Sequence, residues 1–287
     1  MANGLNKTKR RINSVKSTQK ITKAMGMVAT VKLKRYRSLY EGSLSYGEEL
    51  SYIMADLFAH DGETKSHYAY PNDEAPGSLY ILITSDLGLC AGYNAELFKF
   101  ADARVGEGDT LAPMGNRGVN HYQRNPIKGV NLDLSFARLG LDPDPKELKA
   151  ALLNVKRGFN EKHYERVYII YTKYINSLRF EPTLLELLPI ELSYEPKPED
   201  PYCPKLYEPE PRRMIHLLMG QYLSAVMMDR LNESKLSEQA SRRNAMDNAN
   251  DNADELLEKL TIEYNKARQA GITQEITEVV AGARAQE

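Results

Sequence analysis

The two ends of the chain lack proline. No proline occurs before Pro71 or after Pro211, and eight of the 14 prolines lie between Pro182 and Pro211. Proline removes an amide donor and collides with the preceding helical turn, so its absence permits very long helices. Because a long helix cannot bury its own apolar stripe, we predict that residues 1–60 and 207–287 pair as one coiled-coil rod.

Cysteine and long apolar runs are also scarce. The two cysteines, Cys90 and Cys203, argue against a disulfide framework and fit a reducing compartment. No apolar segment follows the basic start, so we expect no signal peptide. Runs such as Leu79–Ile83 are far shorter than the ~20 residues that a membrane-spanning helix needs. Membrane association is therefore expected only through a partner.

Acidic residues are absent before Glu41, although the net charge of the whole chain is only −1. A block of one charge sign attracts an anionic partner, which is nucleic acid, a lipid surface or an acidic protein surface. We call this block the basic arm. Its members are Lys7, Lys9, Arg10, Arg11, Lys16, Lys20, Lys23, Lys32, Lys34, Arg35 and Arg37.

Apolar residues recur every three or four positions in both end segments, which is typical of helices. We interpret the polar stretch Asn232–Asn252 as a surface that avoids a permanent hydrophobic interface. The predicted seam residues include Ile21, Met25, Ala29, Leu33, Tyr36, Tyr40, Leu44, Leu50, Met54 and Leu57, then Met214, Leu218, Tyr222, Leu236, Ala240, Ala253, Leu257, Leu260, Ile272, Ile276, Val279 and Val280.

The middle, residues 75–195, changes character. Short β-rich apolar runs at 79–84, 167–172 and 183–188 predict strands, and 94–103 and 145–162 predict helices. Asp144 and Pro145 are suited to cap and open the second helix. Strands alternating with helices predict an α/β domain with a largely parallel sheet. The proline-rich stretch 194–211 is predicted to be a linker.

Motifs for catalysis are missing. Neither a Walker loop nor G-x-G-x-x-G occurs, and the five histidines show no metal-binding spacing. The segment Ser85–Asn94 lies where α/β folds place ligand loops. It lacks a lysine or a partner acid, so we interpret it as a tight turn between strand and helix, with Cys90 as a small buried residue. We expect no catalytic residue, metal or cofactor.

Four motifs resemble the gamma subunit of F-type ATP synthases. The segment Glu263–Val280 is similar to the family's C-terminal signature, and Arg10–Val15 followed by Thr18–Met25 resembles its opening helix. The segment Ser85–Asn94 resembles a central-domain motif, and Tyr207–Pro211 resembles the turn before the long C-terminal helix. The motifs occur in the family's order and span both ends and the middle.

This resemblance implies an antiparallel coiled coil of the N- and C-terminal helices with an inserted Rossmann-like α/β domain. It also implies a non-catalytic rotor shaft inside a ring of alpha and beta subunits, turned by ion flow through a membrane c-ring. Such a chain would lie at the cytoplasmic face of the cell membrane, with an epsilon subunit at its foot. By motif, the beta-subunit contacts would be Met25, Arg242, Arg268, Gln269 and Thr273, and the foot would include Tyr207 and Glu208.

Four positions depart from the family pattern. Gly26 replaces a residue that is usually charged, Leu87 a common arginine, Ala91 a common glycine and Asp247 a frequent lysine. Two other functions stay open at this point. A coiled-coil scaffold that binds nucleic acid with its basic arm would show salt-sensitive binding, and an enzyme built on the middle domain would show turnover by residues 75–195.

Overall fold

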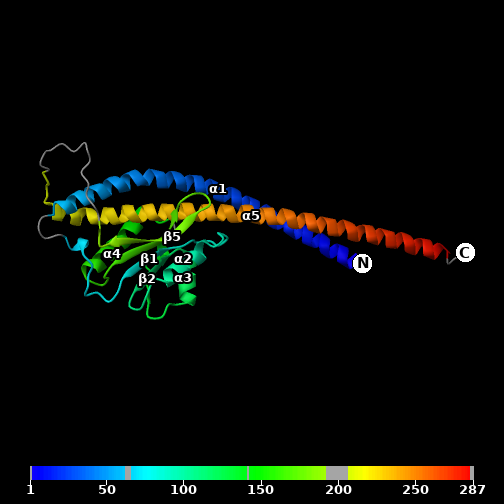
Figure 1. The fold of residues 1–287 in the computed structure, drawn as a ribbon, viewed down its shortest axis with the longest axis horizontal. Helices are drawn as coiled ribbons and strands as arrows, with labels where there is room; N and C mark the ends of the chain where they lie inside the picture. Colours follow the sequence, from blue (N-terminus) through cyan, green and yellow to red (C-terminus); the bar gives the residue numbers. More distant parts are fainter. Residues whose placement is uncertain (1, 62–65, 141, 192–205, 285–287) are drawn as a thin grey trace. The chain divides into compact units, whose positions relative to one another are not determined.

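The computed structural model describes residues 2–61, 66–140, 142–191 and 206–284 (Figure 1). The chain divides into two compact units, of which one joins Met1–Val31 to Arg242–Glu287 and the other comprises Lys32–Ser241. The division into 1–60, 75–195 and 207–287 stays a prediction. Most of the predicted linker, including Cys203, lies outside the described residues.

Two long helices account for nearly half of the chain. Helix α1 runs from Ala2 to Ala59 over 58 residues, and helix α5 runs from Pro211 to Arg284 over 74 residues. Proline occurs only at the first position of α5, where its missing amide would have no partner in any case. Both predicted helices are confirmed, and α1 continues through Gly26, Gly42 and Gly47.

The first unit is an antiparallel helix pair. Gln19 Nε2 donates to Asp254 Oδ1 at 2.6 Å, and a Cβ on Gly26 would lie 3.5 Å from Cβ of Met246. As residue numbers increase along α1, the residues of α5 that lie opposite decrease in number, so the two helices are antiparallel, as predicted. The seam differs in detail, because Ile21 is 61% exposed and Thr22 faces α5 instead. The prediction for Ile21 was wrong by one position of the helix.

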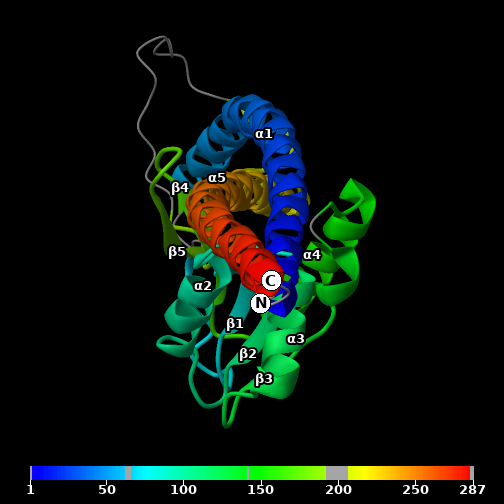
Figure 2. The ribbon, with the colours of Figure 1, turned by 90° about the vertical axis from the view of Figure 1, so that its right-hand side faces the viewer.

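The sheet of the second unit has the order β3-β2-β1-β4-β5, and Figure 2 shows β1, β2 and β3 side by side. All neighbours are parallel except β5, which runs antiparallel to β4. The predicted largely parallel sheet is confirmed, with an antiparallel edge. The strands are β1 Leu79–Ile83, β2 Thr110–Met114, β3 Asn131–Leu132, β4 Val167–Tyr174 and β5 Phe180–Leu188.

Short helices connect these strands: α2 Tyr93–Asp102, α3 Asn116–Arg124, α4 Pro145–Asn160, and the 3-10 turns η1 His67–Ala69 and η2 Ala137–Leu139. Asp144 caps α4, because its Oδ1 accepts the Lys146 amide at 2.7 Å. The predicted cap is confirmed, and the predicted helices at 94–103 and 145–162 differ from α2 and α4 by one or two residues at their ends. Sequence reasoning missed β2, β3 and α3.

Strand β1 separates two hydrophobic clusters. Ile81 and Ile83 pack in the cluster that also contains Leu152 of α4 and Leu223 of α5. Tyr80 and Leu82 face the other cluster, which α2 covers. Alternation along the strand thus buries both faces of the sheet, because successive side chains point to opposite sides. The long helix α5 is part of the core of the second unit.

The interpretation of Asn232–Asn252 as an exposed polar surface was wrong for its first half. Every residue from 231 to 241 is buried. Ser234 Oγ lies 2.8 Å from Tyr93 Oη, and Ser237 Oγ donates to the Thr172 carbonyl at 3.2 Å. These polar side chains form hydrogen bonds with the chain's own α/β domain. The hydrogen bonds offset the free-energy cost of burying them.

Candidate partner-binding surfaces

The C-terminal part of α5 presents the three motif residues assigned to the tip. Arg268, Gln269 and Thr273 are exposed. Thr273 Oγ1 donates to the Gln269 carbonyl at 2.9 Å, a bond within one helical turn. Residues four apart share a helix face, so Gln269 and Thr273 form one polar patch.

Apolar side chains around this patch are exposed as well. The exposed fraction is 45% for Ile272, 59% for Ile276 and 72% for Val279. We predicted that these residues close the helix seam, and for them that prediction was wrong; the side chain of Val280 lies outside the described set. Exposed apolar side chains beside polar ones are typical of protein interfaces. Sequence reasoning assigned these residues to the core because periodicity cannot tell which side chains have a neighbouring helix.

Met25 and Arg242 are not open surface residues. Met25 is half-buried, and Arg242 is only 6% exposed. Nearby on α5, Arg243 Nε lies 3.6 Å from Asp247 Oδ2. The aspartate that departs from the family pattern thus forms an ion pair one turn away along its own helix.

All eleven residues of the basic arm are exposed on α1. Arg37 Nη2 donates to Tyr174 Oη at 2.7 Å, and the Arg35 guanidinium lies 5.8 Å from the Tyr36 ring centroid. The apolar side chains of Met27, Val28 and Val31 are exposed among these cations. An acidic partner that also carries apolar groups would complement this face.

Tyr207 and Glu208 occupy the segment that leads into α5. The Tyr207 hydroxyl donates to Asp56 Oδ2 at 3.1 Å, and its ring lies 5.5 Å from that of His60. Tyr207 is thereby fixed against the end of α1. Glu208 is exposed, and the preceding Leu206 is 91% exposed. This segment can therefore offer an acidic and an apolar group to a partner.

The Ser85–Asn94 loop is held together by its own hydrogen bonds. Asn94 Oδ1 accepts the Ser85 amide at 3.1 Å, and Asn94 Nδ2 donates to Ser85 Oγ at 2.7 Å. Cys90 is buried, and its carbonyl accepts from Ser241 Oγ at 2.7 Å. These bonds accord with the tight-turn interpretation, although the left-handed positions are Leu89 and Ala91 rather than the two glycines.

In the parts of the chain that the structure describes, no group of three His, Cys, Asp or Glu side chains is placed to hold a metal ion. None of the helices described contains an apolar stretch of the length that a bilayer requires.

Comparisons with known proteins agree over the whole length. The ATP synthase family model matches residues 4–286. The ATP synthase gamma chain of Ruminiclostridium cellulolyticum is 35% identical over 302 residues, covering 100% of both chains. The sodium ion specific ATP synthase gamma chain of Acetobacterium woodii is 33% identical, covering 99% of each.

Among solved structures, a chain of the mitochondrial ATP synthase of Euglena gracilis, described as OSCP/F1/c-ring in rotational state 3, has a TM-score of 0.68. It shares 16% identity, and the match covers 100% of this chain and 95% of the other. At that identity the likeness concerns the fold, which has the two long helices and the inserted α/β domain. Together with the full-length sequence matches, it shows that the chain belongs to the ATP synthase gamma chain family.

Proposed function

We propose that the chain is the central rotor shaft of an F-type ATP synthase. It would stand inside a ring of three alpha and three beta subunits and couple ion flow through a membrane c-ring to the catalytic cycle of the beta subunits. The full-length family membership carries this proposal. The two uninterrupted helices α1 and α5 support it, because a shaft needs stiff elements.

Catalysis would take place in the beta subunits, and the chain itself would supply no catalytic residue. The proposed beta-subunit contacts are Arg268, Gln269 and Thr273, which are exposed, together with Met25. Arg242 is included as a contact through the small part of its side chain that reaches the surface. The exposed apolar groups beside Gln269 favour enclosure of this helix by a partner.

The basic arm would face acidic segments of the beta subunits. Its eleven exposed cations and the apolar groups among them fit a protein surface better than nucleic acid, because the arm offers few aromatic rings for stacking on bases. Tyr207 and Glu208 would belong to the foot that meets the c-ring and the epsilon subunit. Through that foot the chain would be a peripheral component at the cytoplasmic face of the cell membrane.

Reconstitution tests this function directly. The purified chain is mixed with alpha and beta subunits of the same source, and co-elution and ATP hydrolysis are measured. We expect a stable complex with one copy of the chain per three alpha and three beta subunits, active in hydrolysis. A well-folded chain that stays outside the hexamer would overturn the proposal.

The two other functions have separate readouts. Nucleic-acid binding that weakens steeply with salt would favour the scaffold, and turnover by residues 75–195 would favour an enzyme. Neither function gains support from the comparisons, which match ATP synthase gamma chains over the whole length.

A further inference from the structure

The outer face of helix α4 is basic and carries one exposed leucine. Lys146, Lys149 and Arg157 are exposed. Between them lie Leu153, which is 41% exposed, and the half-buried Lys156. These five residues follow one another at intervals of mostly three or four positions, so they share a side of the helix. The opposite side of α4 packs into the core of the second unit.

Helix α5 extends this surface. A Cβ on Gly220 would lie 3.0 Å from Leu153 Cδ2, so α4 packs closely against α5 at this point. One turn earlier on α5, the His216 carbonyl accepts from Lys156 Nζ at 2.7 Å. Leu217 lies between these two contacts along α5 and is 65% exposed. The two exposed leucines therefore belong to neighbouring helices where these helices meet.

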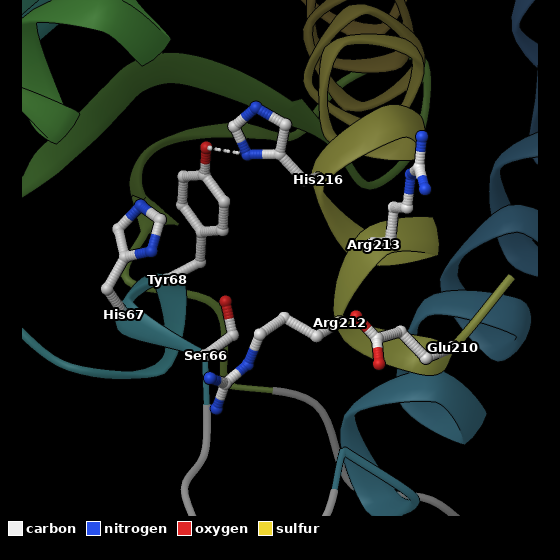
Figure 3. A pocket seen from close by; sticks show the side chains of 7 residues that line it. All are labelled: Ser66, His67, Tyr68, Glu210, Arg212, Arg213 and His216. Atoms are coloured by element: carbon white, nitrogen blue, oxygen red, sulfur yellow. Dashed lines mark hydrogen bonds between the residues drawn. The ribbon is translucent and has the colours of Figure 1, made fainter.

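Arg213 adds a cation on the α5 side of this surface. It is one of the residues that line a cavity of about 530 Å³ between η1 and the first turns of α5. Figure 3, however, shows its guanidinium turned away from Ser66 and Arg212, which line the same cavity. Arg213 precedes Leu217 by four residues, so the two share a side of α5. Its charge is therefore available to a partner at the outer surface.

This surface, which we call the α4 patch, has an excess of positive charge. Within the described ranges none of its five cations forms an ion pair. The acidic residue of α4, Glu147, lines a separate cavity with Asp133 and Tyr164. Neighbouring cations repel one another, and an acidic partner would relieve this repulsion. The members of the α4 patch are Lys146, Lys149, Leu153, Lys156 and Arg157 of α4, with Arg213 and Leu217 of α5.

We propose that the α4 patch binds a protein surface that presents carboxylates around apolar side chains. The two leucines form the dry centre of the contact and the five cations form its polar rim, as is usual for protein interfaces. A lipid surface fits less well, because a helix that binds a membrane buries a wide apolar face. The apolar face of α4 is already in the core.

The α4 patch shares no residue with the beta-subunit contacts, the basic arm or the foot assigned above. The proposal rests on the rotor function, because the partner is sought among the other subunits of the ATP synthase complex. The charge and the exposed leucines of the patch define the chemistry of that partner.

The test replaces Leu217 by the photoreactive residue p-benzoylphenylalanine in the full chain. The ATP synthase that contains this chain is purified into lipid nanodiscs and irradiated, and the cross-linked peptides are identified by mass spectrometry. In the charge variant, the chain also carries Lys146→Gln, Lys149→Gln and Arg157→Gln.

The matched control for the charge variant also changes two lysines and one arginine of the second unit. All three are exposed, and none forms an ion pair within the described ranges. The control changes are Lys99→Gln, Arg124→Gln and Lys128→Gln.

We expect cross-links to one other subunit, at a segment that contains Asp or Glu, with a yield about threefold lower in the charge variant and unchanged in the control. Cross-links to lipid or to a segment without acidic residues, no cross-link, or a yield that does not distinguish charge variant from control would overturn the proposal. Purified material without alpha and beta subunits would overturn the rotor function, and this proposal with it. If the charge variant does not assemble, Lys149→Gln alone provides the comparison.

Discussion

Lys235 Nζ lies 2.6 Å from Asp142 Oδ1, which sets a buried ammonium of α5 against a carboxylate of the segment before α4. The same carboxylate accepts from Tyr36 Oη of α1 at 3.3 Å. Burial lowers the pKa of Lys235, and the hydrogen bond to Asp142 opposes that effect. Burial alone would raise the pKa of Asp142, but the hydrogen bond and charge of Lys235 hold it below 3.8. One carboxylate thus joins both long helices to the α/β domain.

Replacing Asp142 by alanine should lower the free energy of unfolding by about 1–2 kcal/mol, because a buried cation loses its partner. The cost is moderate since the Asp142 side chain is 67% exposed. Adding Lys235→Met should restore much of the loss. Urea denaturation of both single variants and the double variant gives the coupling free energy between Asp142 and Lys235. The control is Asp251→Ala, which changes an exposed site. A coupling below about 0.5 kcal/mol would contradict the relationship.

Glu233 should make stability depend on pH in the acidic range. It is 1% exposed, and burial raises its pKa above 4.5, with the charge of Arg230 opposing. The folded state therefore holds this proton more tightly than the unfolded state. The stabilisation is complete below pH 4.5 and is lost as the pH rises through the folded pKa.

Glu233→Gln should remove this dependence. The free energy of unfolding of the wild type minus that of Glu233→Gln should fall by roughly 1 kcal/mol as the pH rises from about 4.5 to 7. Denaturation curves at several pH values measure the difference. The curve of Glu258→Gln, changed at an exposed site of the same helix, should parallel the wild type. A difference that stays constant with pH would refute the argument.

Ala91 departs from the family's common glycine and has a φ of +47°. A left-handed backbone disfavours a residue with a Cβ, so Ala91→Gly should stabilise the protein by about 0.5–1 kcal/mol. Ala95→Gly, in the first turn of α2, should destabilise it, because glycine has a lower helix propensity than alanine. Chemical denaturation of the two variants should therefore give opposite signs; shifts of the same sign would count against strain at Ala91.

The double change Gln269→Ala and Thr273→Ala should reduce coupled ATP synthesis severalfold while the complex still assembles. Both side chains are exposed, and among the described residues the Thr273 hydroxyl bonds only within its own helix turn, so the fold should not change. Synthesis under an imposed ion gradient and subunit ratios on gels are the measurements.

The control for this double change is Thr261→Ala with Asn252→Ala. Thr261 makes the same type of bond, to the Leu257 carbonyl at 2.7 Å, and neither residue belongs to the proposed contacts. Unchanged synthesis in the Gln269 and Thr273 variant would remove the role assigned to this patch.

The sequence predicted the long helices and the parallel strands because proline placement and apolar runs are local signals. Strand β2 escaped prediction because Pro113 interrupts a short run. The structure accommodates Pro113 because this residue lies beyond the part of β2 that pairs with β3. The residues of β2 that pair with β3 are Thr110 and Leu111. Burial of the polar stretch on α5 depends on which segments cover it, and periodicity does not encode that.

Sites were harder to predict than elements. By periodicity Gln269 and Thr273 are ordinary surface residues of a helix, so only the family motif marked them. The cavity between η1 and the first turns of α5 combines residues 66–68 with 210–216, two segments far apart in the chain. Neither segment carries a motif of its own.

The enclosed turns of α5, residues 231–241, have a mechanical consequence. Ser234, Ser237 and Ser241 bond α2, β4 and the Ser85–Asn94 loop, respectively. For this part of the helix to twist about its own axis against the sheet, all three bonds would have to break together. A torque applied to these turns should therefore rotate the α/β domain together with the helix. The domain in this way fixes the angular position of this part of α5.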